Sequence, residues 1–116
     1  MQLTNIQKSI LNYCIFCYGG KYKLDGNCIR IFVEDDEFYI NATDYRRFGK
    51  YTIFHRNQQR HIDGKRRFHV QGRSTHLPHA FFLCFTHAFN KKYNIRNSHG
   101  DFSRFEKDAL EYNITF

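Results

Sequence analysis

The residues best suited to bind a charged polymer are concentrated in the middle of the chain, between positions 46 and 73. This stretch holds one acid, Asp63, and nine basic residues: Arg46, Arg47, Lys50, Arg56, Arg60, Lys65, Arg66, Arg67 and Arg73. The local charge is therefore +8, in a chain whose formal net charge is +7. Clustered Lys and Arg residues are the electrostatic signature of a surface that meets an anion, nucleic acid above all.

Cutting such a polymer would require a different set of groups. A metal-dependent nuclease could draw on His55, Asp63, His69 and His99. The sequence shows neither the paired carboxylates nor the tight set of histidines on which metal-assisted phosphodiester chemistry relies. We therefore predict a protein that is not an enzyme and needs no metal or cofactor.

The four cysteines and the later histidines give only weak support for a metal site. Cys14 and Cys17 form one C-x-x-C pair, but Cys28 and Cys84 do not supply the second pair that a structural zinc site usually has. His87, on an expected helix, is not spaced to converge with the histidines before it. We interpret the cysteines as structural thiols.

Length and composition indicate one folded domain spanning residues 1–116. Hydrophobic residues make up 41% of the chain, with thirteen Phe and eight Tyr, and most of these rings must be buried in a domain this small. The chain lacks an apolar run long enough to span a membrane and a signal-peptide pattern. We expect a soluble, intracellular protein with no membrane partner.

The elements that must position the basic stretch begin with an ambiguous segment. Residues 3–18 fit a helix in their first half and a buried strand in their second, so both alternatives stay open. Residues 21–41 then read as a meander with strands at 21–24, 28–33 and 38–40. The acidic residues between the last two strands, 34–37, are expected to form a solvated turn.

The basic stretch itself is predicted to contain two helices and a hairpin. Asn41 to Asp44 can cap a short helix that Gly49 ends, and a second helix is expected at about 52–61. Strands at 66–70 and 73–77 would form a hairpin whose tip is Gln71-Gly72, with a basic outer face. Such a hairpin has the shape of a wing.

Two further helices complete the prediction. Pro78 suits the first turn of a helix, and residues 79–93 are apolar enough to be the central core helix. A final helix is expected at about 101–112, opened by the capping box Ser103-x-x-Glu106.

This order of elements resembles the APSES DNA-binding domain of fungal cell-cycle transcription factors of the MluI-box-binding type, and more distantly the viral KilA-N domain. The resemblance rests on Tyr39-Ile40-Asn41-Ala42-Thr43, on the basic hairpin 66–72 with its Gln-Gly pair, on Pro78, and on the helix end from Ala88 to Ile95. It covers about residues 22–105. The chain departs from the family in lacking a longer glycine-rich wing and the Trp that follows the Gln-Gly pair.

The resemblance implies an α+β fold, a winged helix-turn-helix with a small antiparallel sheet, a basic hairpin wing and a C-terminal helix. It implies a nuclear, sequence-specific factor that binds double-stranded DNA at CGCG-core sites and regulates cell-cycle (G1/S) transcription. A transcriptional co-regulator could bind regions outside this chain. The DNA-binding residues it points to are Lys50, Arg56, Gln59, Arg60, Lys65, Arg66, Arg67, Gln71, Gly72 and Arg73.

Two alternatives remain beside this interpretation. One is the metal-dependent nuclease, and the other is a nonspecific DNA- or RNA-binding protein of the viral KilA-N type. An RNA binder would present aromatic side chains on an open sheet, whereas the aromatic residues here follow patterns expected of a core.

Overall fold

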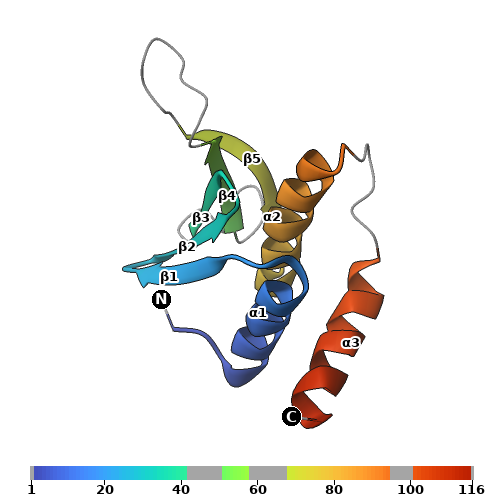
Figure 1. Cartoon of the computed structure of the whole chain (residues 1–116). Helices are drawn as coiled ribbons and strands as arrows, with labels where there is room; N and C mark the ends of the chain where they lie inside the picture. The colour runs from blue at the N-terminus through green and yellow to red at the C-terminus, as the bar shows by residue number, and fades with distance from the viewer. Residues whose placement is uncertain (1, 42–50, 58–67, 95–100, 116) are drawn as a thin grey trace.

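A computed structural model describes residues 2–41, 51–57, 68–94 and 101–115, and these form three helices and a five-stranded antiparallel sheet (Figure 1). The elements are α1 (Asn5–Tyr18), β1 (Lys21–Asp25), β2 (Cys28–Val33), β3 (Asp36–Asn41), β4 (Tyr51–Asn57), β5 (His69–Ser74), α2 (Leu77–Lys92) and α3 (Phe102–Thr115). The strands lie in the order in which they occur in the chain. The expected α+β class is confirmed.

The helices cover one face of the sheet. Helix α2 contacts strands β2 to β5, and α1 and α3 pack beside it (Figure 1). Alternate residues of the central strands point into this layer, as Ile29, Ile31 and Val33 of β2 show by their burial. They meet the fully buried rings of Phe81 and Phe85 on α2, which is therefore the core helix that the sequence predicts.

The open question at the N-terminus is resolved in favour of a helix. Thr4 and Gln7 form a reciprocal capping box at the start of α1, which satisfies two backbone N–H groups that a first turn leaves without partners. Ile10 and Leu11 are fully buried, whereas Phe16 is 66% exposed. Apolar residues in α1 therefore lie both on the side that faces the core and on the side that faces solvent.

Gly20 joins α1 to β1 in a position that only glycine fits. Its φ is +98°, and a Cβ built there would lie 2.5 Å from the backbone oxygen of Phe32. The close approach lets β1 pair with β2 along its whole length, from Lys21 opposite Phe32 to Asp25 opposite Cys28.

The helix expected at about 52–61 is wrong for its first six residues. Residues 51–57 form strand β4, which pairs with β3 on one side and with β5 on the other. Phe54 stacks on Tyr39 across the sheet with ring centroids 4.4 Å apart, and Ile53 is buried on the opposite face. Cross-strand pairing therefore outweighs the local helical pattern. The rest of that helix, and the short one expected at 44–48, lie outside the described residues.

The hairpin expected to turn at Gln71-Gly72 is also wrong. Both residues lie inside β5, where the pairing shifts from Gly72 opposite Ile53 to Val70 opposite Phe54. Gln71 is the extra residue of this irregularity, which behaves as a β-bulge. The actual hairpin consists of β4 and β5, and the chain between them includes residues 58–67.

The last helix begins as predicted at about residue 101, but its cap differs. Asp101 accepts a hydrogen bond from the Arg104 backbone N–H at 3.4 Å, and Phe105 N–H bonds to the Asp101 carbonyl at 3.0 Å. Ser103 lies within the helix, so the predicted Ser103-Glu106 capping box is wrong. An aspartate one residue before the helix provides the cap in its place.

Candidate functional site

The predicted DNA-binding residues divide into two groups in the structure. Arg56 lies on β4, and Gln71, Gly72 and Arg73 lie on β5. The other six fall outside the described residues: Lys50, Gln59, Arg60, Lys65, Arg66 and Arg67. The described members therefore belong to one β-hairpin, but they do not share one face of it.

The basic segments of the chain attach to opposite ends of β4. Asn41 pairs with Thr52 at the end where residues 42–50 join β3 to β4. Asp36 pairs with Asn57 at the other end, where residues 58–67 leave β4 toward β5. Strand β4 thus links the two most basic segments of the chain.

Arg56 lies on the face of the sheet opposite the described helices, where it is already bound. Its guanidinium donates to Glu37 Oε1 from Nε at 3.1 Å and from Nη2 at 2.9 Å, and it stacks over the Phe68 ring at 4.3 Å. Glu37 Oε2 also accepts from Arg30 at 3.0 Å. A carboxylate that is only 2% exposed is thus shared by two arginines. This ion pair gives Arg56 a structural role that the sequence does not reveal.

Aromatic rings lie on this same face, beside the two arginines. Tyr39 stacks on Phe54, and the Phe68 ring meets Tyr39 edge-on with centroids 4.8 Å apart. All three rings are half-buried. These three rings are therefore outside the buried core, which the sequence predicts to hold most of the aromatic residues.

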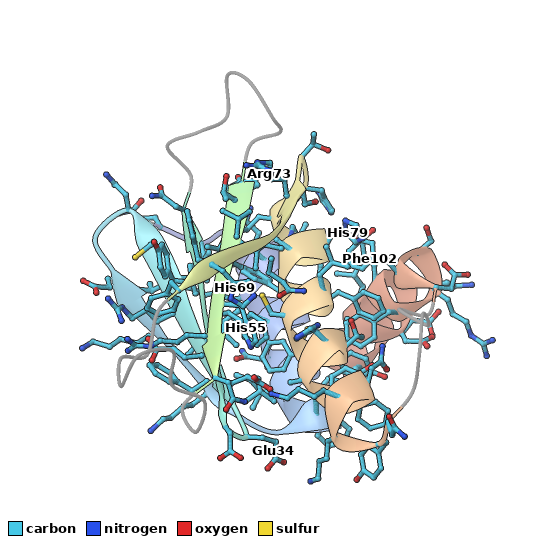
Figure 2. The ribbon with its side chains drawn as sticks, turned by 90° about the horizontal axis from the view of Figure 1, so that it is seen from above. Glu34, His55, His69, Arg73, His79 and Phe102 are labelled. Atoms are coloured by element: carbon cyan, nitrogen blue, oxygen red, sulfur yellow. The ribbon has the colours of Figure 1, made fainter. Side chains whose placement is uncertain are left out.

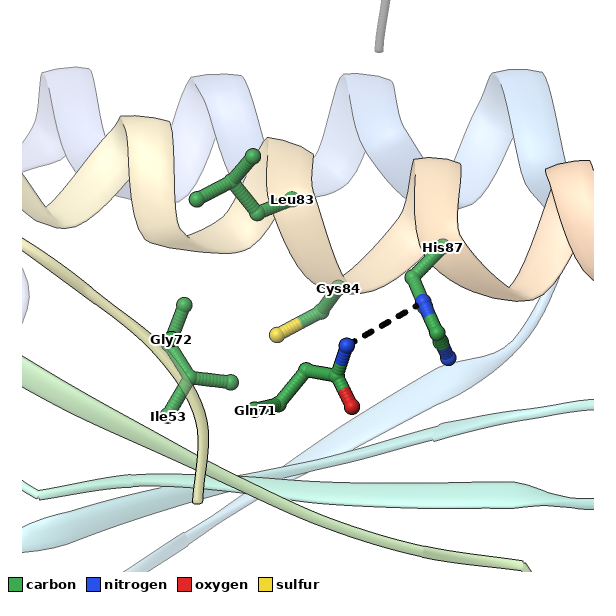
Figure 3. Close-up of a pocket in the computed structure, with 6 residues that line it drawn as sticks. All are labelled: Ile53, Gln71, Gly72, Leu83, Cys84 and His87. Carbon is green, nitrogen blue, oxygen red and sulfur yellow. Dashed lines mark hydrogen bonds between the residues drawn. The ribbon is translucent and has the colours of Figure 1, made fainter. Parts of the chain in front are cut away.

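Arg73, which is labelled in Figure 2, is exposed. In the β4–β5 pairing it lies opposite Thr52. Gln71 points the other way, toward α2, where Oε1 lies 3.1 Å from His69 Nε2 and Nε2 lies 3.4 Å from His87 Nδ1 (Figure 3). The β-bulge accounts for the difference in direction, because without the extra residue Gln71 and Arg73, two positions apart, would face the same side of the sheet.

A cavity of about 190 Å³ lies between β5 and α2 at this point (Figure 3). Its lining residues are Ile53, Gln71, Gly72, Leu83, Cys84 and His87. Two of its polar groups, the Gln71 amide and the His87 imidazole, form the hydrogen bond just described. The cavity thus combines apolar walls with one fixed polar pair.

Of the four acidic residues expected to form a solvated turn, two are exposed as expected and two are buried. Glu34 and Asp35 are exposed at the tip, but Asp36 and Glu37 belong to β3 and are 3% and 2% exposed. The expectation of a fully solvated turn is thus wrong for these two carboxylates. Strand alternation sends one to each face of the sheet, and each finds cationic partners there.

Asp36 is the most heavily bonded of the acids. Its Oδ1 lies 2.7 Å from His55 Nε2, 2.9 Å from Lys91 Nζ and 3.1 Å from Asn57 Nδ2. Burial by itself would raise the pKa of this carboxyl, but the hydrogen bonds from His55, Lys91 and Asn57 and the charge of Lys91 lower its pKa to about 2. The sequence offers no signal for this contact, since Lys91 is 55 residues away.

His55 and His69, both candidates for the nuclease interpretation, are brought together in the structure. His55 Nδ1 lies 3.4 Å from His69 Nε2, and the two rings meet edge-on with centroids 5.0 Å apart (Figure 2). Asp63 and His99 lie outside the described residues. Within the described ranges, no three His, Cys, Asp or Glu side chains are arranged to hold a metal ion.

The cysteines are free thiols in differing surroundings. Cys14 and Cys84 are buried, and burial raises the pKa of both thiols. Cys17 is exposed and Cys28 is half-buried. Cys14 and Cys84 both belong to the hydrophobic core.

No described helix is both long and apolar enough to cross a membrane. Comparison with known proteins identifies no relative: no family model, no curated protein and no solved structure matches this chain.

Proposed function

We propose that this chain is a non-catalytic domain that binds double-stranded DNA through the β4–β5 hairpin and the basic segments at both ends of β4. The observation that carries the proposal is the distribution of charge. The described residues include ten basic and nine acidic side chains, whereas segments 42–50 and 58–67 together hold seven basic and two acidic ones. The excess charge is thus concentrated in two segments anchored to one strand.

Several of the described acids are already paired with basic residues of the fold, so they do not neutralise the basic segments. Asp36 binds Lys91, Glu37 binds Arg30 and Arg56, and Glu34 binds Lys92. The carboxylates in these ion pairs are not available to neutralise the positive charge of segments 42–50 and 58–67. A phosphate backbone offers the complementary charge at a regular spacing.

In this proposal Lys50, Arg60, Lys65, Arg66 and Arg67 contact phosphates. Gln59 and Arg73 are the candidates for reading base edges, because an Arg or Gln can form paired hydrogen bonds there. Three of the predicted DNA-binding residues take other roles. Arg56 supports the sheet through Glu37, and Gln71 and Gly72 face the cavity under α2.

The resemblance to the APSES and KilA-N domains extends the proposal to a nuclear regulator of cell-cycle transcription at CGCG-core sites. The β4–β5 hairpin takes the place of the wing in this account. The helix-turn-helix half of the fold cannot be built from a helix at 52–57, because those residues are a strand.

The test is selection of bound sequences from a random duplex pool, followed by titration at several salt concentrations. Five phosphate contacts would give a log–log salt slope of about −4.5, at about −0.9 for each contact. Enrichment of one short motif would support sequence-specific recognition. Salt-dependent binding without enrichment would support the nonspecific alternative, and a slope near zero would contradict the electrostatic account.

Paired variants make the test specific to the segment after β4. Arg66→Gln with Arg67→Gln should weaken binding and reduce the slope by about 1.8. Arg104→Gln with Lys107→Gln removes the same charge from exposed positions on α3 and should leave the slope unchanged. Equal effects of the two pairs would mean that only net charge matters. Cleavage of a plasmid in the presence of Mg²⁺ would favour the nuclease, and preference for single strands would favour the RNA-binding alternative.

A further inference from the structure

The side chains on the sheet face opposite the helices form three rows, because the strands pair in register. The central row takes one residue from each strand: Lys23, Arg30, Tyr39, Phe54 and Val70. The row on one side of it consists of Lys21, Phe32, Glu37 and Arg56, and the row on the other side consists of Asp25, Cys28, Asn41, Thr52 and Arg73. Residues that alternate with these rows on β2, β3 and β4 are buried under the helices. We call the three rows, together with Phe68, the outer face.

The outer face is positively charged, in contrast to the other described residues. Its charged side chains are five basic residues, Lys21, Lys23, Arg30, Arg56 and Arg73, and two acids, Asp25 and Glu37. Of the ten basic and nine acidic residues described, five basic and seven acidic ones therefore lie elsewhere. The outer face thus has a formal charge of +3, and the rest of the described chain has −2. A face with this excess attracts an anionic partner.

Four aromatic rings lie among these charges. Tyr39 and Phe54 are stacked with 15° between their ring planes, and Phe68 meets Tyr39 edge-on. On the neighbouring row, Lys21 Nζ lies 5.7 Å from the centre of the Phe32 ring. All four rings are half-buried, so part of each ring is in contact with solvent. The outer face therefore presents ring surfaces and cations at adjacent positions.

Buried and exposed acids hold two of the arginines in place beside these rings. Glu37 binds Arg56 through one carboxylate oxygen and Arg30 through the other, and Arg30 Nε also donates to Asp25 at 3.1 Å. The Arg56 guanidinium lies over the Phe68 ring at 4.3 Å. Side chains that are fixed before a ligand arrives lose little conformational entropy on binding. The outer face is thus organised in advance.

We propose that the outer face binds single-stranded nucleic acid, with unpaired bases stacked on Phe32, Tyr39 and Phe54 and phosphates bound by Lys21 and Lys23. An unpaired strand offers exposed base faces joined by phosphates, which match rings interspersed with cations. A duplex has its base faces covered by its own stacking, and an apolar protein surface would bury the basic side chains without neutralising them.

The number of bases bound at once is small. A sheet face that carries aromatic rings stacks about two or three unpaired bases. This binding uses rings that the proposed duplex binding leaves unused, and of the residues assigned to duplex binding it shares only Arg73. The two proposals can therefore fail separately.

The test measures fluorescence anisotropy of labelled thymidine and uridine strands of about twelve nucleotides, titrated with the whole chain. Tyr39→Leu with Phe54→Leu keeps apolar side chains at these half-buried positions but removes the rings, and should weaken binding about 5- to 100-fold. Phe16→Leu removes a ring that is 66% exposed on α1, and should bind like the wild type. Binding to either strand supports the proposal, and the tighter strand identifies the preferred sugar. Failure of both strands to bind, or a double variant as tight as the wild type, would overturn the proposal.

A fluorescent reporter tests stacking without removing a ring. The chain has no tryptophan, so Phe54→Trp places a single indole on the outer face, and Phe16→Trp places one on α1 as the control. A base stacked on the indole quenches its fluorescence. The thymidine strand should therefore quench Phe54→Trp and leave Phe16→Trp unchanged. Unchanged fluorescence of Phe54→Trp at strand concentrations that saturate the anisotropy would overturn the proposal.

The lysines and a duplex ligand complete the test. Lys21→Gln with Lys23→Gln should reduce the log–log salt slope for the single strand by about 1.4, at about 0.7 for each phosphate contact. Arg104→Gln with Lys107→Gln should leave this slope unchanged. Duplex binding should be the same in the wild type and in the leucine double variant, and equal losses for duplex and single strand would overturn the role of the rings. A wild type that binds the single strand but no duplex would contradict the proposed duplex binding and support the outer-face proposal.

Discussion

Removing the charge of Asp36 tests whether the contact between β3 and the end of α2 stabilises the fold. Asp36→Asn keeps the size of the side chain but removes the charge that accepts hydrogen bonds from His55, Lys91 and Asn57 and that forms the ion pair with Lys91, whose Nζ lies 2.9 Å from the carboxylate. Asp36 is 3% exposed, so the interaction is poorly screened by solvent. The carboxyl pKa of about 2, against an ordinary value of 3.8, corresponds to about 2 kcal/mol at neutral pH.

The direction of the pH dependence follows from this lowered pKa. The contribution of Asp36 is present in full above its unfolded pKa of 3.8 and is lost as pH falls through its folded pKa of about 2. The wild type should therefore lose about 2 kcal/mol of unfolding free energy between pH 5 and pH 2 that Asp36→Asn does not lose. The two proteins should converge in stability at the acid end.

Urea unfolding at pH 7, 5, 3 and 2 measures both quantities. Asp35→Asn is the matched control, because Asp35 is the exposed neighbour in the same turn and should change stability by less than about 0.5 kcal/mol. If Asp36→Asn were as stable as Asp35→Asn at pH 7, the charge of the Asp36 carboxylate would contribute nothing to stability. The structural role given to Asp36 would then be wrong.

Two further substitutions test the sheet. Glu37→Gln removes the buried carboxylate that binds one arginine on each neighbouring strand. The free energy of unfolding, measured with urea at pH 7, should fall by about 2–4 kcal/mol. A fall below about 1 kcal/mol would contradict the structural role of Glu37. Gly20→Ala should cost more than Gly26→Ala in thermal unfolding, since both have positive φ but only a Cβ at Gly20 would strike the Phe32 backbone, at 2.5 Å. The Gly26 variant should lose about 1–2 kcal/mol, and equal losses would show that the close approach at Gly20 is relieved without cost.

Local patterns predicted those elements whose burial is set by their own residues. The alternation in residues 28–33 predicts a half-buried strand, and Pro78 with the apolar run after it predicts the core helix, as the structure confirms. The meander and the α+β class follow from the same periodicities. Charge is also a property of composition, so the basic stretch is visible before any fold is known.

Features that depend on residues far apart in the chain could not be predicted from these local patterns. Residues 51–57 become a strand because β3 and β5 lie on either side of them, and this pairing turns Gln71 from an expected hairpin tip into a bulge under α2. Asp36 and Lys91, 55 positions apart, meet because α2 crosses the sheet. Sequence alone thus determined the class of fold and the sign of its charge. Tertiary structure decided which acids are buried, which arginines are already bound, and which aromatic rings meet on the face of the sheet opposite the helices, because each of these results from contacts between elements far apart in the chain.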